Sequence, residues 1–182
     1  LSSNQNLKEL RCQSNKLTSL NLSRNPYLEE ALCSFNKLKE LDLSKNKYLR
    51  ELHCSKNKIK GLELQENTKL ERLWISNNSI MNIDVSQNTK LRAFHCSNNK
   101  LSTLDVSKND SIEELWCFDN NLTNLNITNN LILRRLYCYN NQLTDIDTSK
   151  NNKLKYLKLN ENDLDPSSFD YGDPFWFTTI IS

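Results

Sequence analysis

Residues 7–27 read LKELRCQSNKLTSLNLSRNPY, and this 21-residue unit recurs along the chain without insertion or deletion. Two asparagine columns have the same period. The first contains Asn15, Asn36, Asn57, Asn78, Asn99, Asn120, Asn141 and Asn162, and the second contains Asn4, Asn25, Asn46, Asn67, Asn88, Asn109, Asn130 and Asn151. A fixed period of this length predicts a solenoid in which each unit forms one coil and stacking closes a continuous core.

The segment around each cysteine, such as residues 9–13, alternates outward and inward and predicts a short strand. The ladder asparagines are expected to satisfy buried backbone groups of their own coil and of the next coil. The convex turns leave little room for an α-helix and should be irregular or 3₁₀. We therefore predict a right-handed curved solenoid, mostly β and irregular, with a parallel sheet of about eight short strands.

The pattern L-x-x-L-x-(L/C)-x-x-N-x-L resembles the leucine-rich repeat. Its 21-residue length, and the cysteine in place of leucine, are most similar to the cysteine-ladder internalins of the internalin J type and related bacterial surface proteins. The resemblance covers about residues 1–164. It implies that the strands line a concave face where a partner binds, and that the partner is extracellular or on a host surface.

The period divides the chain into two predicted parts. Residues 1–164 form the solenoid, with a partial first coil, seven full repeats from 7 to 153 and a partial eighth. Residues 165–182 depart from the repeat and are rich in aromatic side chains, so we expect a capping segment over the last coil rather than a binding tail or another domain.

Composition limits the classes of partner. The net charge is +2, with both signs mixed throughout, and this gives no sign of a basic patch for nucleic acid. No apolar run approaches membrane-spanning length. The opening residues LSSNQN match the last third of a repeat rather than a signal peptide, so we expect a processed or trimmed fragment. We predict a location outside a bacterial cell or on its surface, with an intracellular scaffold as the alternative.

All six cysteines share one column, which also holds Ile75 and Leu159. Neighbouring Cβ atoms in parallel strands lie about 4.8 Å apart, beyond the spacing that a disulfide needs. A linear row cannot wrap four ligands around zinc. We therefore predict free, buried thiols that pack as small hydrophobic groups, and neither a metal nor a cofactor.

The sequence shows no catalytic constellation. His53 and His95 each precede a ladder cysteine and so point to the opposite face of a strand, and the two histidines sit two coils apart with Trp74 between them. No Ser/His/Asp order or glycine-rich phosphate loop is present. We predict that the protein is not an enzyme.

One outward column alternates in sign and is expected to neutralise itself through cross-strand pairs. It contains Lys8, Glu29, Arg50, Glu71, Arg92, Glu113, Arg134 and Lys155.

Aromatic residues gather on the outward strand positions of the later coils. The candidate binding residues are Trp74, His95, Trp116, Phe118, Tyr137, Tyr139 and Tyr156. Stacking of the coils does not require them, so a contact patch is the preferred interpretation over cross-strand pairing that only stabilises the sheet. A protein ligand is the predicted partner, a glycan is the alternative, and a structural spacer is a further possibility.

Overall fold

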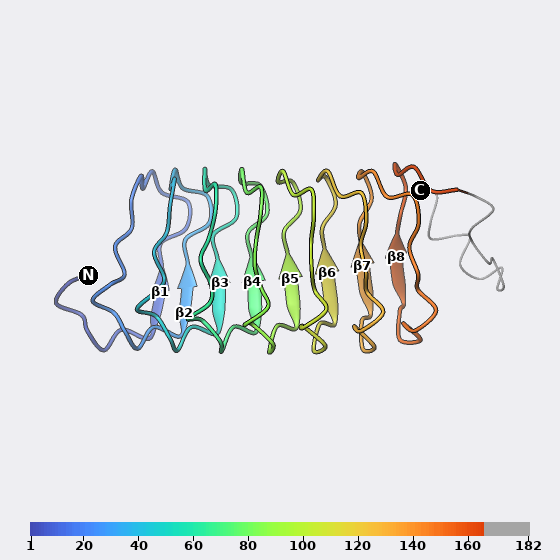
Figure 1. Cartoon of the computed structure of the whole chain (residues 1–182). Coiled ribbons are helices and arrows are strands. Elements are labelled where there is room, and N and C mark those ends of the chain that lie inside the picture. Colours follow the sequence, from blue (N-terminus) through green and yellow to red (C-terminus); the bar gives the residue numbers. More distant parts are fainter. Residues whose placement is uncertain (166–182) are drawn as a thin grey trace.

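A computed structural model describes residues 1–165, and in it the chain forms a single stack of coils (Figure 1). Eight strands of three residues each form one sheet in the order β1-β2-β3-β4-β5-β6-β7-β8. They are β1 Glu9–Arg11, β2 Glu30–Leu32, β3 Glu51–His53, β4 Arg72–Trp74, β5 Ala93–His95, β6 Glu114–Trp116, β7 Arg135–Tyr137 and β8 Tyr156–Lys158. The prediction of a mostly β and irregular repeat solenoid is confirmed, and no turn within residues 1–165 is helical.

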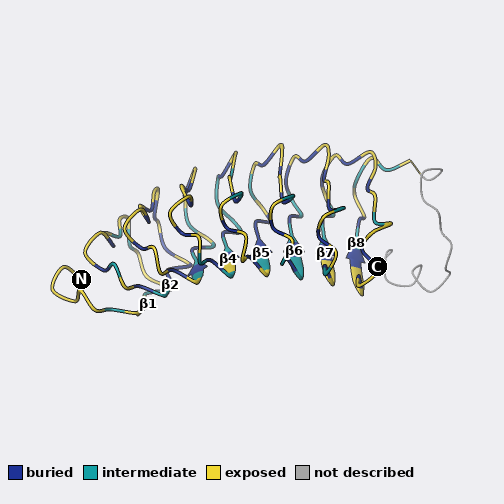
Figure 2. Cartoon of the chain, turned by 60° about the horizontal axis from the view of Figure 1, so that its bottom comes forward, coloured by how far each residue is buried: buried dark blue, intermediate teal, exposed yellow. Residues whose placement is uncertain are grey.

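Every neighbouring pair of strands is parallel and offset by one repeat. Leu73 pairs with Phe94, and Phe94 pairs with Leu115, so equivalent positions of successive coils lie side by side. The middle residue of each strand from β2 to β8 is buried, whereas the flanking residues mostly face solvent (Figure 2). The repeat therefore converts each sequence column into a straight row of side chains along the solenoid.

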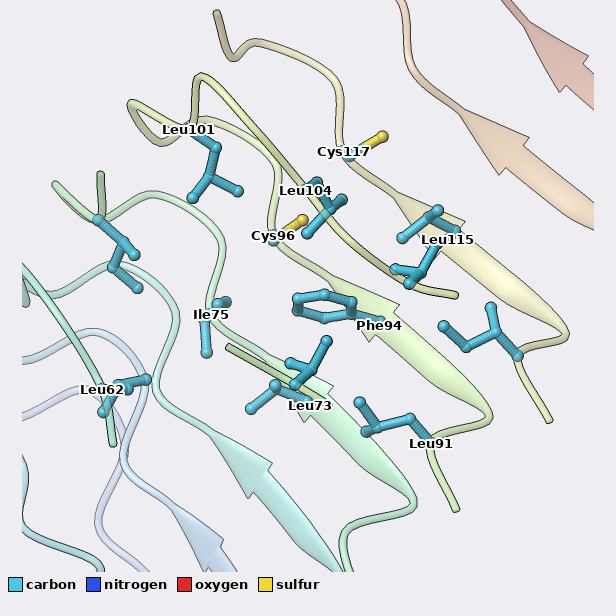
Figure 3. Packing of buried hydrophobic residues seen from close by; sticks show 14 of the residues in the cluster. Leu62, Leu73, Ile75, Leu91, Phe94, Cys96, Leu101, Leu104, Leu115 and Cys117 are labelled. Atoms are coloured by element: carbon cyan, nitrogen blue, oxygen red, sulfur yellow. The ribbon is translucent and has the colours of Figure 1, made fainter. Parts of the chain in front are cut away.

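The core is a continuous column of aliphatic side chains between the sheet and the turns. Leu73, Phe94 and Leu115 are fully buried beneath the strands, and the thiols of Cys96 and Cys117 extend the same layer (Figure 3). All six cysteines are free, as predicted. Cys12 differs from the expectation of full burial because it follows β1, which has a neighbouring strand on one side only, and it is half-buried.

The first asparagine ladder joins each coil to the one before it. Asn99 Nδ2 donates to the carbonyls of Ile75, Cys96 and Ser97 at 3.1, 3.0 and 3.3 Å, and its Oδ1 accepts from the backbone N–H of Ile80 at 3.0 Å. Ile75 and Ile80 belong to the preceding coil. The expectation of bonds to the next coil was wrong in direction, because the amide of Asn99 reaches backbone groups on the other side, in the preceding coil.

The second ladder acts through its donor atoms. Asn109 Nδ2 donates to the carbonyls of Val85 and Asn88, both at 2.9 Å, whereas its buried Oδ1 has no hydrogen-bond partner. The same pattern recurs at Asn46 and Asn130. Both ladders are thus structural.

One residue per coil has a left-handed backbone conformation, with φ between 50° and 58°. These residues are Ser14, Phe35, Lys56, Asn77, Asn98, Asp119, Asn140 and Glu161. Each immediately precedes an asparagine of the first ladder. None is glycine, the residue that usually occupies such positions. The tight turn after each strand therefore depends on the ladder bonds that hold it.

The predicted division into solenoid and cap stays a prediction, because all of the proposed capping segment except Asp165 lies outside the described residues. Within residues 1–165, no helix is long and apolar enough to cross a membrane.

Candidate binding face on the sheet

The outward side of the sheet carries a row of five ring side chains. The row contains His53, Trp74, His95, Trp116 and Tyr137, one from the end of each strand from β3 to β7. The strand register places each residue opposite the next. Because parallel strands lie about 4.8 Å apart, the rings are close enough to stack.

The five rings form one continuous stack, which we call the ring stack. The centroids of His53 and Trp74 are 3.8 Å apart with an interplanar angle of 12°, and those of Trp74 and His95 are 5.1 Å apart at 8°. The rings of His95 and Trp116 are nearly parallel, with centroids 3.9 Å apart and an interplanar angle of 1°, and those of Trp116 and Tyr137 are 5.4 Å apart at 26°. Interior rings therefore have both faces covered by neighbours.

The other predicted site residues lie near the ring stack. Phe118 and Tyr139 form a second stacked pair, with centroids 4.4 Å apart and an interplanar angle of 8°. Tyr156 is in neither group. It is exposed on β8, and the guanidinium of Arg135 lies 5.1 Å from its ring centroid.

Burial of the ring stack is greater than the sequence suggested. His95 is only 8% exposed, and Trp74, Trp116 and Tyr137 are half-buried because their faces contact one another. The indole Nε1 atoms of Trp74 and Trp116 are also buried and have no hydrogen-bond partner. The outward rings thus present edges rather than faces.

His53 is a member of the ring stack that the set of candidate site residues omitted. The sequence could have identified His53 as a candidate, because it occupies the same repeat position as Trp74 and His95. The column alone does not say whether neighbouring rings stack or splay apart, because that depends on side-chain torsions.

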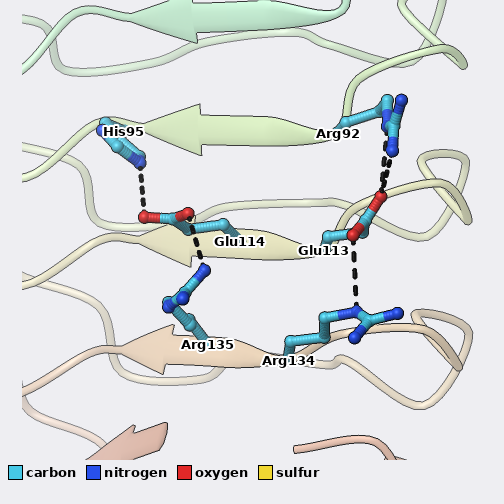
Figure 4. Close-up of polar contacts among 6 residues, drawn as sticks. All are labelled: Arg92, His95, Glu113, Glu114, Arg134 and Arg135. Carbon is cyan, nitrogen blue, oxygen red and sulfur yellow. Dashed lines mark hydrogen bonds and ion pairs between the residues drawn. The ribbon is translucent and has the colours of Figure 1, made fainter.

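A glutamate contacts each histidine, and an arginine contacts each glutamate. His95 Nε2 lies 3.2 Å from Glu114 Oε1, and Arg135 lies 3.6 Å from the other carboxylate oxygen (Figure 4). Burial lowers the pKa of His95 below its ordinary value of 6.5, against the opposing effect of Glu114. The stacked imidazole therefore favours its neutral form.

The arrangement repeats around His53. Its Nε2 lies 2.8 Å from Glu51 Oε1, outside hydrogen-bond geometry, and Arg72 lies 3.1 Å from the second oxygen of Glu51. Burial again lowers the pKa of the imidazole. Each glutamate thus faces an arginine as well as a histidine, which leaves little unpaired negative charge beside the rings.

The predicted self-pairing of the alternating charge column is confirmed over most of its length. Glu113 lies between Arg92 and Arg134, at 2.6 and 3.4 Å (Figure 4). Lys8 pairs with Glu29 and Arg50 with Glu71, both at 3.0 Å. This edge of the sheet is consequently close to neutral.

A separate groove of about 540 Å³ lies outside the strands. Polar residues such as Asn82 and Thr103 line it together with the aliphatic side chains of Leu62, Ile83 and Leu104, and no ring-stack residue takes part. Within residues 1–165, no group of three or more His, Cys, Asp and Glu side chains is placed to hold a metal ion.

No protein-family model and no curated protein matches the sequence. Among solved structures, the chain is similar to the functional domain of InlJ from Listeria monocytogenes, which includes a cysteine ladder, with 34% identity and a TM-score of 0.72. That match covers 88% of this chain and 40% of the other.

Two further bacterial structures are similar. A leucine-rich repeat protein of Leptospira interrogans has 26% identity and a TM-score of 0.84, covering 90% of this chain and 45% of its own. YopM, a leucine-rich effector protein from Yersinia pestis, has 26% identity and a TM-score of 0.74, covering 86% of this chain and 44% of its own. The chain thus spans less than half the length of each of these proteins.

Proposed function

Because the chain is a leucine-rich repeat solenoid with 21-residue repeats that resembles the cysteine-ladder internalins, we propose that it is a non-catalytic module that recognises a protein partner through the solvent side of its sheet. We place this module in a surface or secreted protein of a bacterium. The observation that carries the proposal is the ring stack, together with the Phe118–Tyr139 pair beside it.

The position of the rings supports a binding role. The core requires only the inward residue of each strand, which is Leu73, Phe94 or Leu115 in the central coils. Aromatic side chains on the outward positions are extra apolar surface, and Trp and Tyr are the residues that most often anchor protein interfaces. Stacking also holds them in one conformation, which lowers the entropy lost on binding.

Ring orientation favours a protein over a glycan. A sugar binds by laying its C–H groups on an aromatic face, but the faces of Trp74, His95 and Trp116 are covered by neighbouring rings. Bases of a single-stranded nucleic acid need the same open faces. Ring edges flanked by paired charges suit a protein surface, which can combine apolar contact with hydrogen bonds at the rim.

Two double variants separate binding from folding. Trp116→Ala/Tyr137→Ala removes two rings of the stack, whereas Tyr27→Ala/Tyr48→Ala removes an exposed aromatic pair elsewhere, with centroids 5.9 Å apart. Both variants and the wild type would be screened on protein arrays and glycan arrays, and any captured protein would be confirmed by isothermal titration with purified components.

The expected result is a protein ligand that the wild type and Tyr27→Ala/Tyr48→Ala bind alike. The Trp116→Ala/Tyr137→Ala variant should lose about 2 kcal/mol or more of binding free energy per ring. Circular dichroism checks that it remains folded. A partner that binds this variant as tightly as the wild type refutes the proposed face. If the only ligands that this variant loses are oligosaccharides, a glycan replaces the protein as the partner of the ring stack.

A further inference from the structure

Lysines recur on the turns that follow β1, β2 and β3, at the edge of the solenoid where these strands end. We define the lysine face as Lys16, Lys37, Lys39, Lys58 and Lys60, all of which are exposed. The core residues Leu17, Leu38 and Ile59 alternate with them. The lysines therefore project from the solvent side of three consecutive turns.

Backbone hydrogen bonds keep these turns in register. The N–H of Lys37 donates to the carbonyl of Leu17, and the N–H of Lys58 donates to that of Leu38, both at 2.8 Å. Equivalent positions in such a parallel ladder repeat about every 4.8 Å. Lys16, Lys37 and Lys58 are thus three like charges in a straight row, an arrangement that destabilises a ladder in the absence of a counter-charge.

No carboxylate neutralises this row. Among residues 1–165, the only lysines in ion pairs are Lys8 and Lys47. Of the nearby acids, Asp42 accepts the N–H of Ser44 and Glu63 accepts the amide of Gln65. Glu40 is exposed next to Lys39 but, within residues 1–165, takes part in no ion pair. This contrasts with the column that begins at Lys8, where charges alternate and pair.

The lysine face is also confined to one end of the described solenoid. In the column of Lys58, the following coils contain Ser79, Lys100, Asn121 and Gln142. Repetition of the coil therefore does not demand lysine here. The mild overall charge of +2 conceals this local excess of positive charge.

We infer that the lysine face binds an extended acidic polysaccharide. Its rows are straight and regular, and their spacing is close to the length of one sugar unit in an extended chain. Carboxylate or sulfate groups along such a chain can meet lysines of successive coils. All five residues are lysine, whose ammonium acts as a compact point charge with three donors that can meet single carboxylate or sulfate groups.

The one aromatic neighbour argues for the same class of ligand. Phe35 is exposed beside the lysine face, but Lys56 Nζ lies 4.6 Å from the centroid of its ring. The edge therefore has a single, partly covered ring and no row of aromatic faces on which successive bases could stack. An acidic polysaccharide needs no such platform.

The test measures binding of fluorescein-labelled heparin fragments and of oligogalacturonate by fluorescence anisotropy, with neutral dextran and single-stranded DNA as comparison ligands. Lys16→Gln/Lys37→Gln/Lys58→Gln removes three charges from the lysine face. Lys90→Gln/Lys108→Gln/Lys150→Gln removes three exposed charges elsewhere and gives the same net charge. Thermal melting confirms that both variants fold.

We expect the wild type to bind at least one acidic polysaccharide, with an affinity that falls as salt is raised. The lysine-face variant should bind it at least about tenfold more weakly, and the matched variant less than about twofold more weakly. Trp116→Ala/Tyr137→Ala should bind like the wild type, which separates this surface from the ring stack. A single Lys37→Glu change at the centre of the face should reproduce most of the loss.

Three outcomes would overturn the inference. One is no binding of either acidic polysaccharide even at low salt. Another is an equal loss in the two triple variants, which would reduce the effect to net charge. The third is tighter binding of single-stranded DNA that is lost in the lysine-face variant, which would change the class of ligand to nucleic acid.

Discussion

An asparagine of the first ladder contributes more to the stability of its turn than the size of its side chain suggests. Asn99 supplies four hydrogen bonds, and two of them cross to the preceding coil. No aliphatic residue can replace a side chain that donates and accepts at once. The stability of each turn therefore depends on one amide.

The substitution Asn99→Ala should lower the free energy of unfolding by about 1–3 kcal/mol, because it leaves buried backbone groups without partners. Asn126→Ala is the matched control, since its Oδ1 accepts only from Thr128 in an exposed turn. The control should lose less than about 1 kcal/mol. Urea denaturation measures both, and equal losses would mean that the ladder assignment is wrong.

Single cysteine residues differ in how accessible their thiols are to reagents. Burial raises the pKa of Cys33 and of Cys117 to about 12, so neither forms a reactive thiolate near neutral pH. A thiol reagent at about pH 8 should label at most Cys12 in the native protein and all six cysteines after denaturation.

The variant Cys12→Ser should abolish labelling of the native protein and leave five reactive thiols in the denatured one, because the other cysteines are all buried. Fewer than six thiols in the denatured, unreduced wild type would show that the ladder forms disulfides. Rapid native labelling of more than one thiol would instead show that the coils separate readily.

At the scale of the strand, the ring stack links five elements through their outermost side chains. Each aromatic contact is worth about 0.5–1.5 kcal/mol beyond its buried area. The histidines make this contribution sensitive to pH. Their pKa values lie below 6.5 in the folded protein, so folding favours the neutral imidazole.

The lowered pKa values of the two histidines determine how the stability of the folded protein changes with pH. Stability from the histidines is fully present above about pH 6.5 and is lost as the pH falls towards their folded pKa values. The melting temperature of the wild type should therefore be lower at about pH 5.5 than at about pH 7.5. His53→Phe/His95→Phe should keep the stack and show a smaller difference. An equal difference in both proteins would exclude the histidines as its source.

Sequence columns predicted which residues of the strands become neighbours, because the period is invariant. Trp74, His95 and Trp116 are adjacent in the sheet as expected. Their burial was not predictable, since outward positions on a sheet are ordinarily exposed. Face-to-face stacking depends on side-chain torsion angles, and these angles cannot be read from the sequence pattern.

The lysine face shows a different limit of prediction from sequence. Its residues are visible in the printed sequence, but whole-chain charge balance hid them. The alternating signs of the Lys8 column and the like charges of Lys16, Lys37 and Lys58 are both visible in the sequence, but only the contacts show that the second set has no ion-pair partner. Sequence reasoning thus predicted the pairs of the Lys8 column and missed the unpaired lysines.

At the scale of the whole molecule, the solenoid should tolerate loss of a complete coil. Deleting residues 91–111 joins coils with identical registers, so both ladders continue and Trp74 comes to face Trp116. Stability in a linear repeat is about the sum of coil and interface terms. The shortened protein should fold cooperatively, with a denaturant m-value lower by about one eighth.

Deletion of residues 92–111 is the control for that experiment. It leaves one surplus residue before the following strand, which disturbs the link between the asparagine ladder and the sheet. This longer protein should be less stable than the one lacking a complete coil. Equal or greater stability would show that the 21-residue register is not what holds the stack together.

The residues with a left-handed backbone conformation imply that backbone strain differs between the coils of the solenoid. Asparagine and aspartate tolerate this conformation, whereas phenylalanine, lysine and glutamate adopt it at a cost. Coils with Asn77, Asn98, Asp119 and Asn140 are consequently relaxed, and those with Phe35, Lys56 and Glu161 hold strained backbone. Amide hydrogen exchange should be slowest in the relaxed coils, which also carry most of the ring stack. Partner recognition would then rest on the part of the molecule that opens least often.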